Sequence, residues 1–370
     1  MKDFLVQLDD LPDELLMYIF KKLSNNEVLY SLIGVNQRIK RIARDRIFTH
    51  HLCLLEYCRI DDSSIPLSGP VLDRFCSKIL PEIGHQIETL YLERTSIRRI
   101  LHVTNYPNLN NLGLCDMDDA RVAISLFSDT NCLIHLFNNQ ISSLFISFNE
   151  KMNSFENRWS YWDIFAKIMT IFTNLRCLKF NPYLPVHHTF FSNKALKTAI
   201  SSTLLELHIN ISDISMRDFH HILDGRFDQL RILHVNMDKI GFQSPYKPLN
   251  ENRLPNLRIF SLYGFCVTCI DKFNESVAPF LRRMINLEEL DLNLDVVFYQ
   301  NGIDGDILKK DIMIHMARLY KFTFNIYTTK HRNQTIFPLN ESIAKTFKDY
   351  SKCKEIFCID HFEYVKLSGK

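Results

Sequence analysis

The sequence Leu287-Glu288-Glu289-Leu290-Asp291-Leu292 is one copy of a short pattern, Φ-x-x-Φ-x-Φ with Φ an apolar residue. Eight further copies begin at Ile87, Leu109, Ile141, Leu175, Leu204, Leu230, Leu257 and Leu319. The first and last starts are 232 residues apart over eight intervals, so the mean period is 29 residues. The last two apolar residues of each copy are two positions apart, which places both on one face of a β-strand. The pattern therefore predicts a strand that recurs along most of the chain.

Apolar residues at helical spacing fall between several of these strands. Phe165, Ala166 and Met169 precede the fourth copy, and Phe219, Ile222 and Leu223 precede the sixth, where Gly225 follows as a predicted helix-ending glycine. Strand, loop and helix at this period indicate a right-handed stack of βα units, which makes the chain an α/β protein. A further strand at Ile356–Ile359 is expected to cap the C-terminal end.

Several copies continue with a small polar residue and another apolar one, as in Leu92–Thr95–Ile97 and Val235–Asp238–Ile240. The extended pattern resembles the leucine-rich repeat, L-x-x-L-x-L-x-x-[N/C/T]-x-[LI]. The resemblance implies a horseshoe-shaped βα solenoid whose parallel sheet lines the concave face. Such a face is typical of a protein that binds other proteins.

Alternation along each strand predicts which side chains point out of that sheet. The fourth and sixth residues of each copy point inward, and the third, fifth and seventh point outward. We expect the outward set to contact a target protein, with aromatic anchors among its members. The candidates are Tyr91, Phe145, Lys179, His208, His234, Tyr263 and Asp291. Asparagine recurs at the seventh position, either as a hydrogen-bonding ladder that finishes the strands or as a row that reads a ligand.

The N-terminal residues carry a different pattern. Leu11, Leu15, Ile19 and Leu23 recur at steps of four, with Leu16 and Phe20 beside them, and they predict an amphipathic helix that starts near Pro12. Residues 24–27, Ser-Asn-Asn-Glu, form a capping box that predicts a second helix from Asn25. A third helix is expected after Asn36, with Ile39, Ile42, Ala43 and Ile47 on one side. Three such short helices leave apolar surface for a partner, or for the rest of the chain, to cover.

Residues 8–48 resemble the F-box, whose pattern is roughly L-P-x-E-[LI]-[LI]-x-x-[IV]-[FL]-x-x-L. The resemblance implies docking onto the Skp-type adaptor of cullin–RING ubiquitin ligases. The positions that match the pattern and would make this contact are Leu11, Pro12, Leu15, Ile19, Phe20 and Leu23. The alternative is a helical cap that closes the N-terminal end of the repeat. The domains expected are an F-box-like helical domain at 1–50, a linker with the first solenoid helix at 51–84, and the solenoid with its C-terminal cap at 85–370.

Composition narrows the classes of function. The chain has 44 Lys plus Arg and 42 Asp plus Glu, and this balance favours neither nucleic acid nor an anionic membrane as partner. We see neither a secretory signal nor an 18-residue apolar run, so the ten cysteines are expected to be reduced, in the cytoplasm or the nucleus. No membrane contact is expected.

Motifs for catalysis or metal binding are not found. Cys266 and Cys269 form the only C-x-x-C, without a second ligand pair, and no phosphate-binding loop, nucleophile elbow or H-E-x-x-H occurs. The sequence therefore predicts a non-enzyme without cofactor or metal. The expected function is the substrate receptor of an SCF-type ubiquitin ligase, acting in ubiquitin-dependent degradation of a target protein that the sequence does not name. The alternative is a leucine-rich-repeat scaffold with no ligase role.

Overall fold

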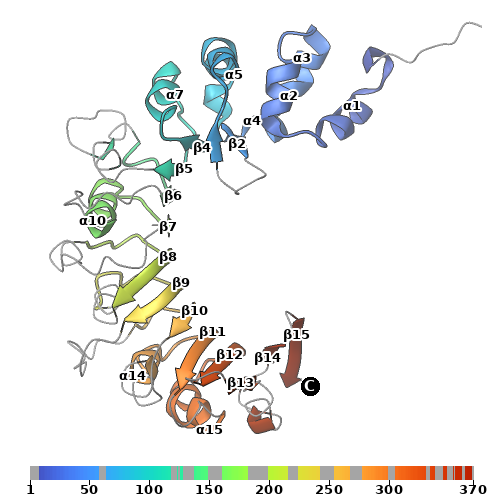
Figure 1. The fold of residues 1–370 in the computed structure, drawn as a ribbon. Helices are drawn as coiled ribbons and strands as arrows, with labels where there is room; N and C mark the ends of the chain where they lie inside the picture. The colour runs from blue at the N-terminus through green and yellow to red at the C-terminus, as the bar shows by residue number, and fades with distance from the viewer. Residues whose placement is uncertain are drawn as a thin grey trace, which may run out of the picture. The chain divides into compact units, whose positions relative to one another are not determined.

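The structure is a computed structural model of the 370-residue chain. It describes residues 8–57, 64–117, 123, 126–127, 137–148, 161–181, 199–215, 224–241, 254–266, 277–298, 305–330, 334–337, 345–347, 353, 355–360 and 363–368. Contacts divide the chain into two compact units (Figure 1). Unit 1 comprises Met1–Asp118 and Ser128–Ser147, and unit 2 comprises Asp119–Phe127 and Phe148–Lys370. The predicted boundaries at residues 50 and 84 stay predictions.

Four helices open unit 1: α1 (Asp13–Phe20), α2 (Asn25–Leu32), α3 (Gln37–Ala43) and α4 (Arg46–Thr49), after a 3₁₀ turn at Leu8–Asp10. The predicted capping box is present, because Ser24 Oγ accepts from the Glu27 amide and the Glu27 carboxylate accepts from the Ser24 amide. Asn36 caps α3 in the same manner through the Ile39 amide (2.7 Å). Local polar side chains thus fix where α2 and α3 begin.

The prediction that Ile47 shares the buried side of the third helix is wrong. Ile39, Ile42 and Ala43 are buried, but α3 ends at Ala43 and Ile47 is 37% exposed. The cause is Asp45, whose carboxylate accepts from the Ile47 amide and starts the separate helix α4. A fourth short helix therefore joins the three expected from the sequence.

Ion pairs fasten these helices to each other and to the segment that follows. Asp13 at the start of α1 binds Arg38 (2.7 Å) and Arg41 (2.6 Å) of α3. Glu82 binds Lys40 (3.1 Å) and also Arg44. Arg38 further donates to the Leu11 carbonyl (2.5 Å), so the start of α1 is held at three points. These pairs are partly solvated, so each one alone adds little to stability.

The rest of unit 1 consists of strands with helices on one side of them (Figure 1). The strands run in the order β1-β4-β5-β6, and β2 and β3 form a separate antiparallel pair. The bounds of the strands are His51–Cys53 (β1), Leu55–Tyr57 (β2), Ser64–Pro66 (β3), Thr89–Glu93 (β4), Asn111–Met117 (β5) and Ser143–Phe148 (β6). The helical elements are α5 (Gly69–Arg74), a π-helical turn at Phe75–Ile79, α6 (Leu80–Ile83), a 3₁₀ turn at Gly84–Gln86 and α7 (Ile97–Val103).

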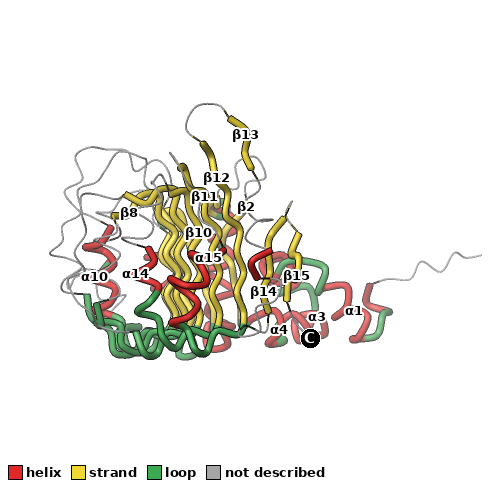
Figure 2. Tube along the Cα trace, turned by 90° about the horizontal axis from the view of Figure 1, so that it is seen from below, coloured by secondary structure: helices red, strands yellow, loops and turns green. Residues whose placement is uncertain are grey.

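Unit 2 contains a sheet in the order β7-β8-β9-β10-β11-β12-β14-β15, and β13 pairs with β12. Neighbours from β7 to β14 run parallel, and the last pair, β14 with β15, is antiparallel. Figure 2 shows these strands side by side. Their bounds are Cys177–Asn181 (β7), Glu206–Ser215 (β8), Ile232–Gly241 (β9), Ile259–Cys266 (β10), Glu289–Phe298 (β11), Lys321–Lys330 (β12), Gln334–Phe337 (β13), Glu355–Asp360 (β14) and Glu363–Ser368 (β15). The predicted extra strand near Ile356 is thus confirmed as β14.

The structure gives the register of β4 with β5 and of the strands from β7 to β12, and in these pairs the copies of the repeat are aligned position by position. Residues at the same position of neighbouring copies are direct partners, as in His208 with His234 and Asp291 with Thr323. The fourth and sixth residues of all nine copies are buried: Leu90, Leu92, Leu112, Leu114, Leu144, Ile146, Leu178, Phe180, Leu207, Ile209, Leu233, Val235, Phe260, Leu262, Leu290, Leu292, Phe322 and Phe324. Their burial leaves the odd positions on the opposite face of the strands.

Helices lie between several strands of unit 2, and α10 (Tyr161–Ile171) contains the apolar residues predicted for a helix before the fourth copy. The other described ones are α14 (Ala278–Leu281), α15 (Gly305–Ile307), a π-helical turn at Leu308–Ile312 and a 3₁₀ turn at Met313–His315. Figure 1 places α10, α14 and α15 on the same side of the strands. The helix expected from Phe219 to Leu223 lies outside the described residues, but Gly225 has the left-handed φ of +100° predicted for it.

Candidate binding surfaces

Helix α1 and the turn that follows it carry two apolar stripes that have different environments. Leu16 and Phe20, one turn apart, are 0% and 2% exposed, and the Phe20 ring contacts Phe48 of α4 edge-on at 6.5 Å. Leu15, Ile19 and Leu23, also at steps of four, are 50%, 39% and 43% exposed. One stripe is enough to pack a helix onto its neighbours. The second stripe is therefore not needed to pack the helix against the rest of the domain.

The six residues predicted for the adaptor contact separate in the structure. Leu15, Ile19 and Leu23 form the open stripe, Pro12 is exposed at the N-cap of α1, and Leu11 is half-buried. Phe20 lies apart from them in the packed stripe, because it faces α4 rather than solvent. Periodicity alone did not separate the two stripes, since both consist of apolar residues four positions apart.

Sequence reasoning missed two other exposed apolar residues that lie near this stripe in the sequence. Leu8 is 43% exposed and Tyr18 is 62% exposed, with the Lys22 ammonium 4.9 Å above the Tyr18 ring centroid. Tyr18 follows Leu15 by three residues, a spacing that puts both on one side of the helix. We define the open stripe as Leu8, Leu15, Tyr18, Ile19 and Leu23. Five partly exposed apolar side chains within 16 residues indicate a surface that another molecule covers.

The comparison with protein families assigns this helical region. Residues 8–51 match the F-box domain. The match includes α1 to α4 and the open stripe, and it supports the resemblance seen in the sequence. No curated protein matches the chain. Across the described helices, none is both long and apolar enough to cross a membrane.

The basic residues of the F-box domain are engaged with carboxylates. Besides the pairs made by Asp13 and Glu82, Arg46 at the start of α4 binds Glu88. The guanidinium groups of Arg38 and Arg41 hold the pKa of Asp13 below its usual range, chiefly through the hydrogen bond from Arg38. The basic residues from Arg38 to Arg46 therefore join elements of unit 1.

Two predicted target-face residues of unit 1, Tyr91 and Phe145, form an aromatic row. Both are half-buried, and their ring centroids are 6.0 Å apart although β5 runs between their strands. The His51 ring extends the row on the other side of Tyr91, at 5.7 Å. Gly113 of β5 makes this possible, because a Cβ at Gly113 would lie 2.1 Å from the Tyr91 ring. The row lies on the outward side of the strands.

Three predicted residues of unit 2 form a second row across β7, β8 and β9. Lys179, His208 and His234 are successive partners in register. The two imidazole rings stack, with centroids 4.5 Å apart and an interplanar angle of 26°. Burial lowers the pKa of His234 below its usual value, and the neighbouring His208 acts in the same direction. His234 is thus held in its neutral form near pH 7.

Tyr263 and Asp291, the remaining predicted residues, make a direct contact. The Tyr263 hydroxyl donates to Asp291 Oδ2, while the buried Asp291 Oδ1 has no hydrogen-bond partner in the described structure. Burial raises the pKa of Asp291 above its usual value, although the hydrogen bond from Tyr263 opposes this. At the seventh position, Asn325 Nδ2 donates to Asn293 Oδ1 (3.2 Å), as expected for an asparagine ladder.

One cluster of potential metal ligands is found among the described residues. Cys177, Glu206 and His208 place one ligand atom each within 4.8 Å of one another. All three belong to unit 2 and are half-buried. The sequence analysis had predicted no metal site.

Proposed function

We propose that this chain is the substrate-recognition subunit of an SCF-type (cullin–RING) E3 ubiquitin ligase. The F-box domain binds the Skp-type adaptor, and the outward face of the repeat strands binds a target protein. The chain itself catalyses nothing and needs no cofactor for this role. It acts by holding the target at high effective concentration near the ubiquitin-carrying enzyme, in the cytoplasm or the nucleus.

The observation that carries the proposal is the open stripe on α1. F-box domains typically bind Skp-type adaptors, and this F-box domain keeps one apolar stripe packed and a second one exposed. Completing the burial of one half-exposed aliphatic side chain contributes about 1 kcal/mol. Leu15, Ile19 and Leu23 together then supply about 3 kcal/mol, a substantial part of the free energy of a micromolar complex.

The strands fit a leucine-rich-repeat solenoid, which we propose for the region after the F-box domain. The support is the parallel pairing of the repeat strands and the equal register of their positions in the pairs β4–β5, β8–β9, β10–β11 and β11–β12. In this architecture the outward residues line the concave face of a horseshoe. The aromatic row of Tyr91 and Phe145, and the polar rows of unit 2, are then the target-binding surface.

Adaptor binding is tested with the purified full chain and a recombinant Skp-type adaptor. Leu15→Ala combined with Ile19→Ala removes the centre of the open stripe, and we expect adaptor affinity to fall by at least about tenfold, the loss that corresponds to 1.4 kcal/mol. Because Leu15 is 50% and Ile19 39% exposed, neither belongs to the buried core, and helix content and melting temperature should stay close to wild type.

Two variants control this experiment. Ile314→Ala removes a 59% exposed isoleucine of unit 2 and should leave adaptor affinity unchanged. Leu16→Ala removes a fully buried leucine from the packed stripe and should lower stability by about 2–5 kcal/mol. A wild-type chain that does not bind the adaptor would overturn the ligase role.

The competing function is a repeat scaffold whose N-terminal helices act only as a cap. It is favoured by the contacts that join these helices to the next segment, such as Asn25 to the His51 carbonyl (2.8 Å) and Arg74 to the Ile33 carbonyl (2.9 Å). A cap predicts no adaptor binding, and a large loss of stability when the open stripe is mutated. Both differ from the results expected of a receptor.

A further inference from the structure

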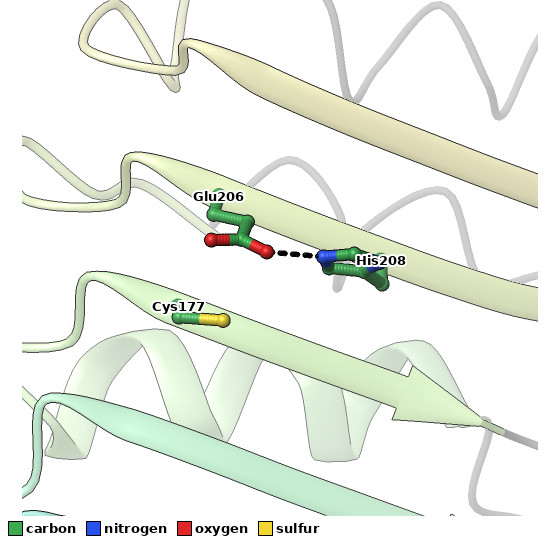
Figure 3. Close-up of side chains that lie close together, drawn as sticks. All are labelled: Cys177, Glu206 and His208. Atoms are coloured by element: carbon green, nitrogen blue, oxygen red, sulfur yellow. Dashed lines mark hydrogen bonds and ion pairs between the residues drawn. The ribbon is translucent and has the colours of Figure 1, made fainter. Parts of the chain in front are cut away.

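Cys177, Glu206 and His208 are brought together by the pairing of two strands (Figure 3). Cys177 of β7 is the direct register partner of Glu206 of β8, and His208 lies two residues beyond Glu206 on the same face. The side chains of Glu206 and His208 touch, with Glu206 Oε1 2.5 Å from His208 Nε2. One thiol, one carboxylate and one imidazole therefore converge on the outward face of the sheet.

The ligand atoms are near the spacing of a small divalent ion but do not yet have it. They lie within 4.8 Å of one another, and Glu206 Oε1 is 2.5 Å from His208 Nε2, whereas tetrahedral zinc holds its ligand atoms about 3.5 Å apart. Binding therefore requires the thiol to approach and the carboxylate and imidazole to separate. Half-buried side chains on two paired strands close such a gap by small rotations about their χ angles, without moving the backbone. The sheet already holds the three Cα atoms in place.

The ligand chemistry selects among the metals. Thiolate and imidazole together favour zinc over magnesium or calcium, which prefer oxygen ligands alone. Thiolate, imidazole and carboxylate are all ligand types found in zinc proteins. The Cys177 thiolate and the Glu206 carboxylate together supply two negative charges, which balance the charge of the ion. On binding, the thiol proton passes to the buffer.

We propose that Cys177, Glu206 and His208 form a zinc site on the outward face of strands β7 and β8. The chain supplies three ligands to an ion that takes four, so the fourth position is left to water or to a side chain of a bound partner. The site stands on the geometry of unit 2 alone, and it does not depend on the proposed ligase role.

The site is tested by titrating the purified, reduced full chain with Co²⁺, which replaces Zn²⁺ and reports thiolate ligation by a charge-transfer band in the near ultraviolet. We expect this band, with the visible bands of four-coordinate cobalt, and we expect one equivalent of Zn²⁺ to abolish both. Cys177→Ser should lose the charge-transfer band. Glu206→Gln and His208→Gln should retain the thiol but bind roughly tenfold or more weakly.

Cys53→Ser is the matched control, since it removes an exposed cysteine of unit 1 and should leave the titration unchanged. Circular dichroism establishes whether each variant is folded. If Cys177→Ser does not fold, the cobalt affinities of the single variants Glu206→Gln and His208→Gln test the site instead. The proposal is overturned by a wild-type chain without the band, by a band that persists in Cys177→Ser, or by unchanged affinity in both glutamine variants.

Discussion

At the scale of single residues, the Asp291 carboxylate on the outward face of the strands lowers the stability of the fold. Asp291 is half-buried, its Oδ1 has no hydrogen-bond partner in the described structure, and burial raises its pKa. A raised pKa means that the folded chain prefers the protonated form. The destabilisation by Asp291 is therefore absent when the pH is below about 3.9, the pKa of an aspartate in the unfolded chain. It grows as the pH rises from there toward the pKa of Asp291 in the folded chain.

Asp291→Asn tests this reasoning. The amide keeps an oxygen that accepts the Tyr263 hydroxyl but carries no charge, so we expect the melting temperature at pH 7 to rise by about 1–3 °C. Thermal melts from pH 7 down to pH 3 should show the difference shrink and vanish. A variant that is less stable than wild type at pH 7 would mean that the charge itself has a stabilising contact.

Gly113 allows a second residue-scale prediction. Gly113→Ala places a Cβ 2.1 Å from the Tyr91 ring, so the ring must turn away and leave its contact with Phe145. We expect a loss of about 1–3 kcal/mol in the free energy of unfolding, measured by denaturant titration. Tyr91→Ala combined with Gly113→Ala should recover part of that loss, since the clash is then gone. Equal stability of the double and single variants would contradict this role for Gly113.

At the scale of elements, the start of α2 depends on one side chain. Ser24→Ala removes the acceptor for the Glu27 amide, and the expected loss is about 0.5–2 kcal/mol in the free energy of unfolding. Ser31→Ala, at an exposed position within the same helix, is the control and should change stability by less than about 0.5 kcal/mol. If Ser24→Ala and Ser31→Ala had the same free energy of unfolding, the capping box would contribute nothing to stability.

Elements with strong local signals could be predicted from the sequence. The strands followed from apolar residues at a fixed period, and their register followed because each copy repeats the same positions, as with His208 and His234. The capping box likewise predicted where α2 begins. The break at Asp45 was missed, because an apolar pattern runs through it and only the cap shows that the helix restarts.

The binding surfaces could be predicted only in part. Leu15 and Leu16 are equally apolar, and only the packing of α1 against its neighbours decides that Leu16 is buried and Leu15 is 50% exposed. The metal cluster was missed for another reason. Cys177 and His208 lie in different copies of the repeat, so no local motif joins them and only the pairing of β7 with β8 brings them together.

At the scale of the whole molecule, the proposed function needs different surfaces for different partners. We propose that the open stripe of α1 binds the adaptor and that the outward residues of the strands bind the target. Tyr91→Ala combined with Phe145→Ala should therefore reduce recovery of target proteins from cells treated with a proteasome inhibitor, while adaptor recovery stays unchanged. Loss of the adaptor in this variant would contradict the separation of the two surfaces.

Hydrogen–deuterium exchange of the purified full chain, with and without a Skp-type adaptor, tests the central claim most directly. The account predicts slower exchange of amides in α1 and its flanks, residues 8–24, when the adaptor is added. Exchange in the strands from Cys177 to Asp360 should not change. Unchanged exchange in α1 at saturating adaptor, or protection confined to the strands, would contradict the assignment of the open stripe as the adaptor-binding surface.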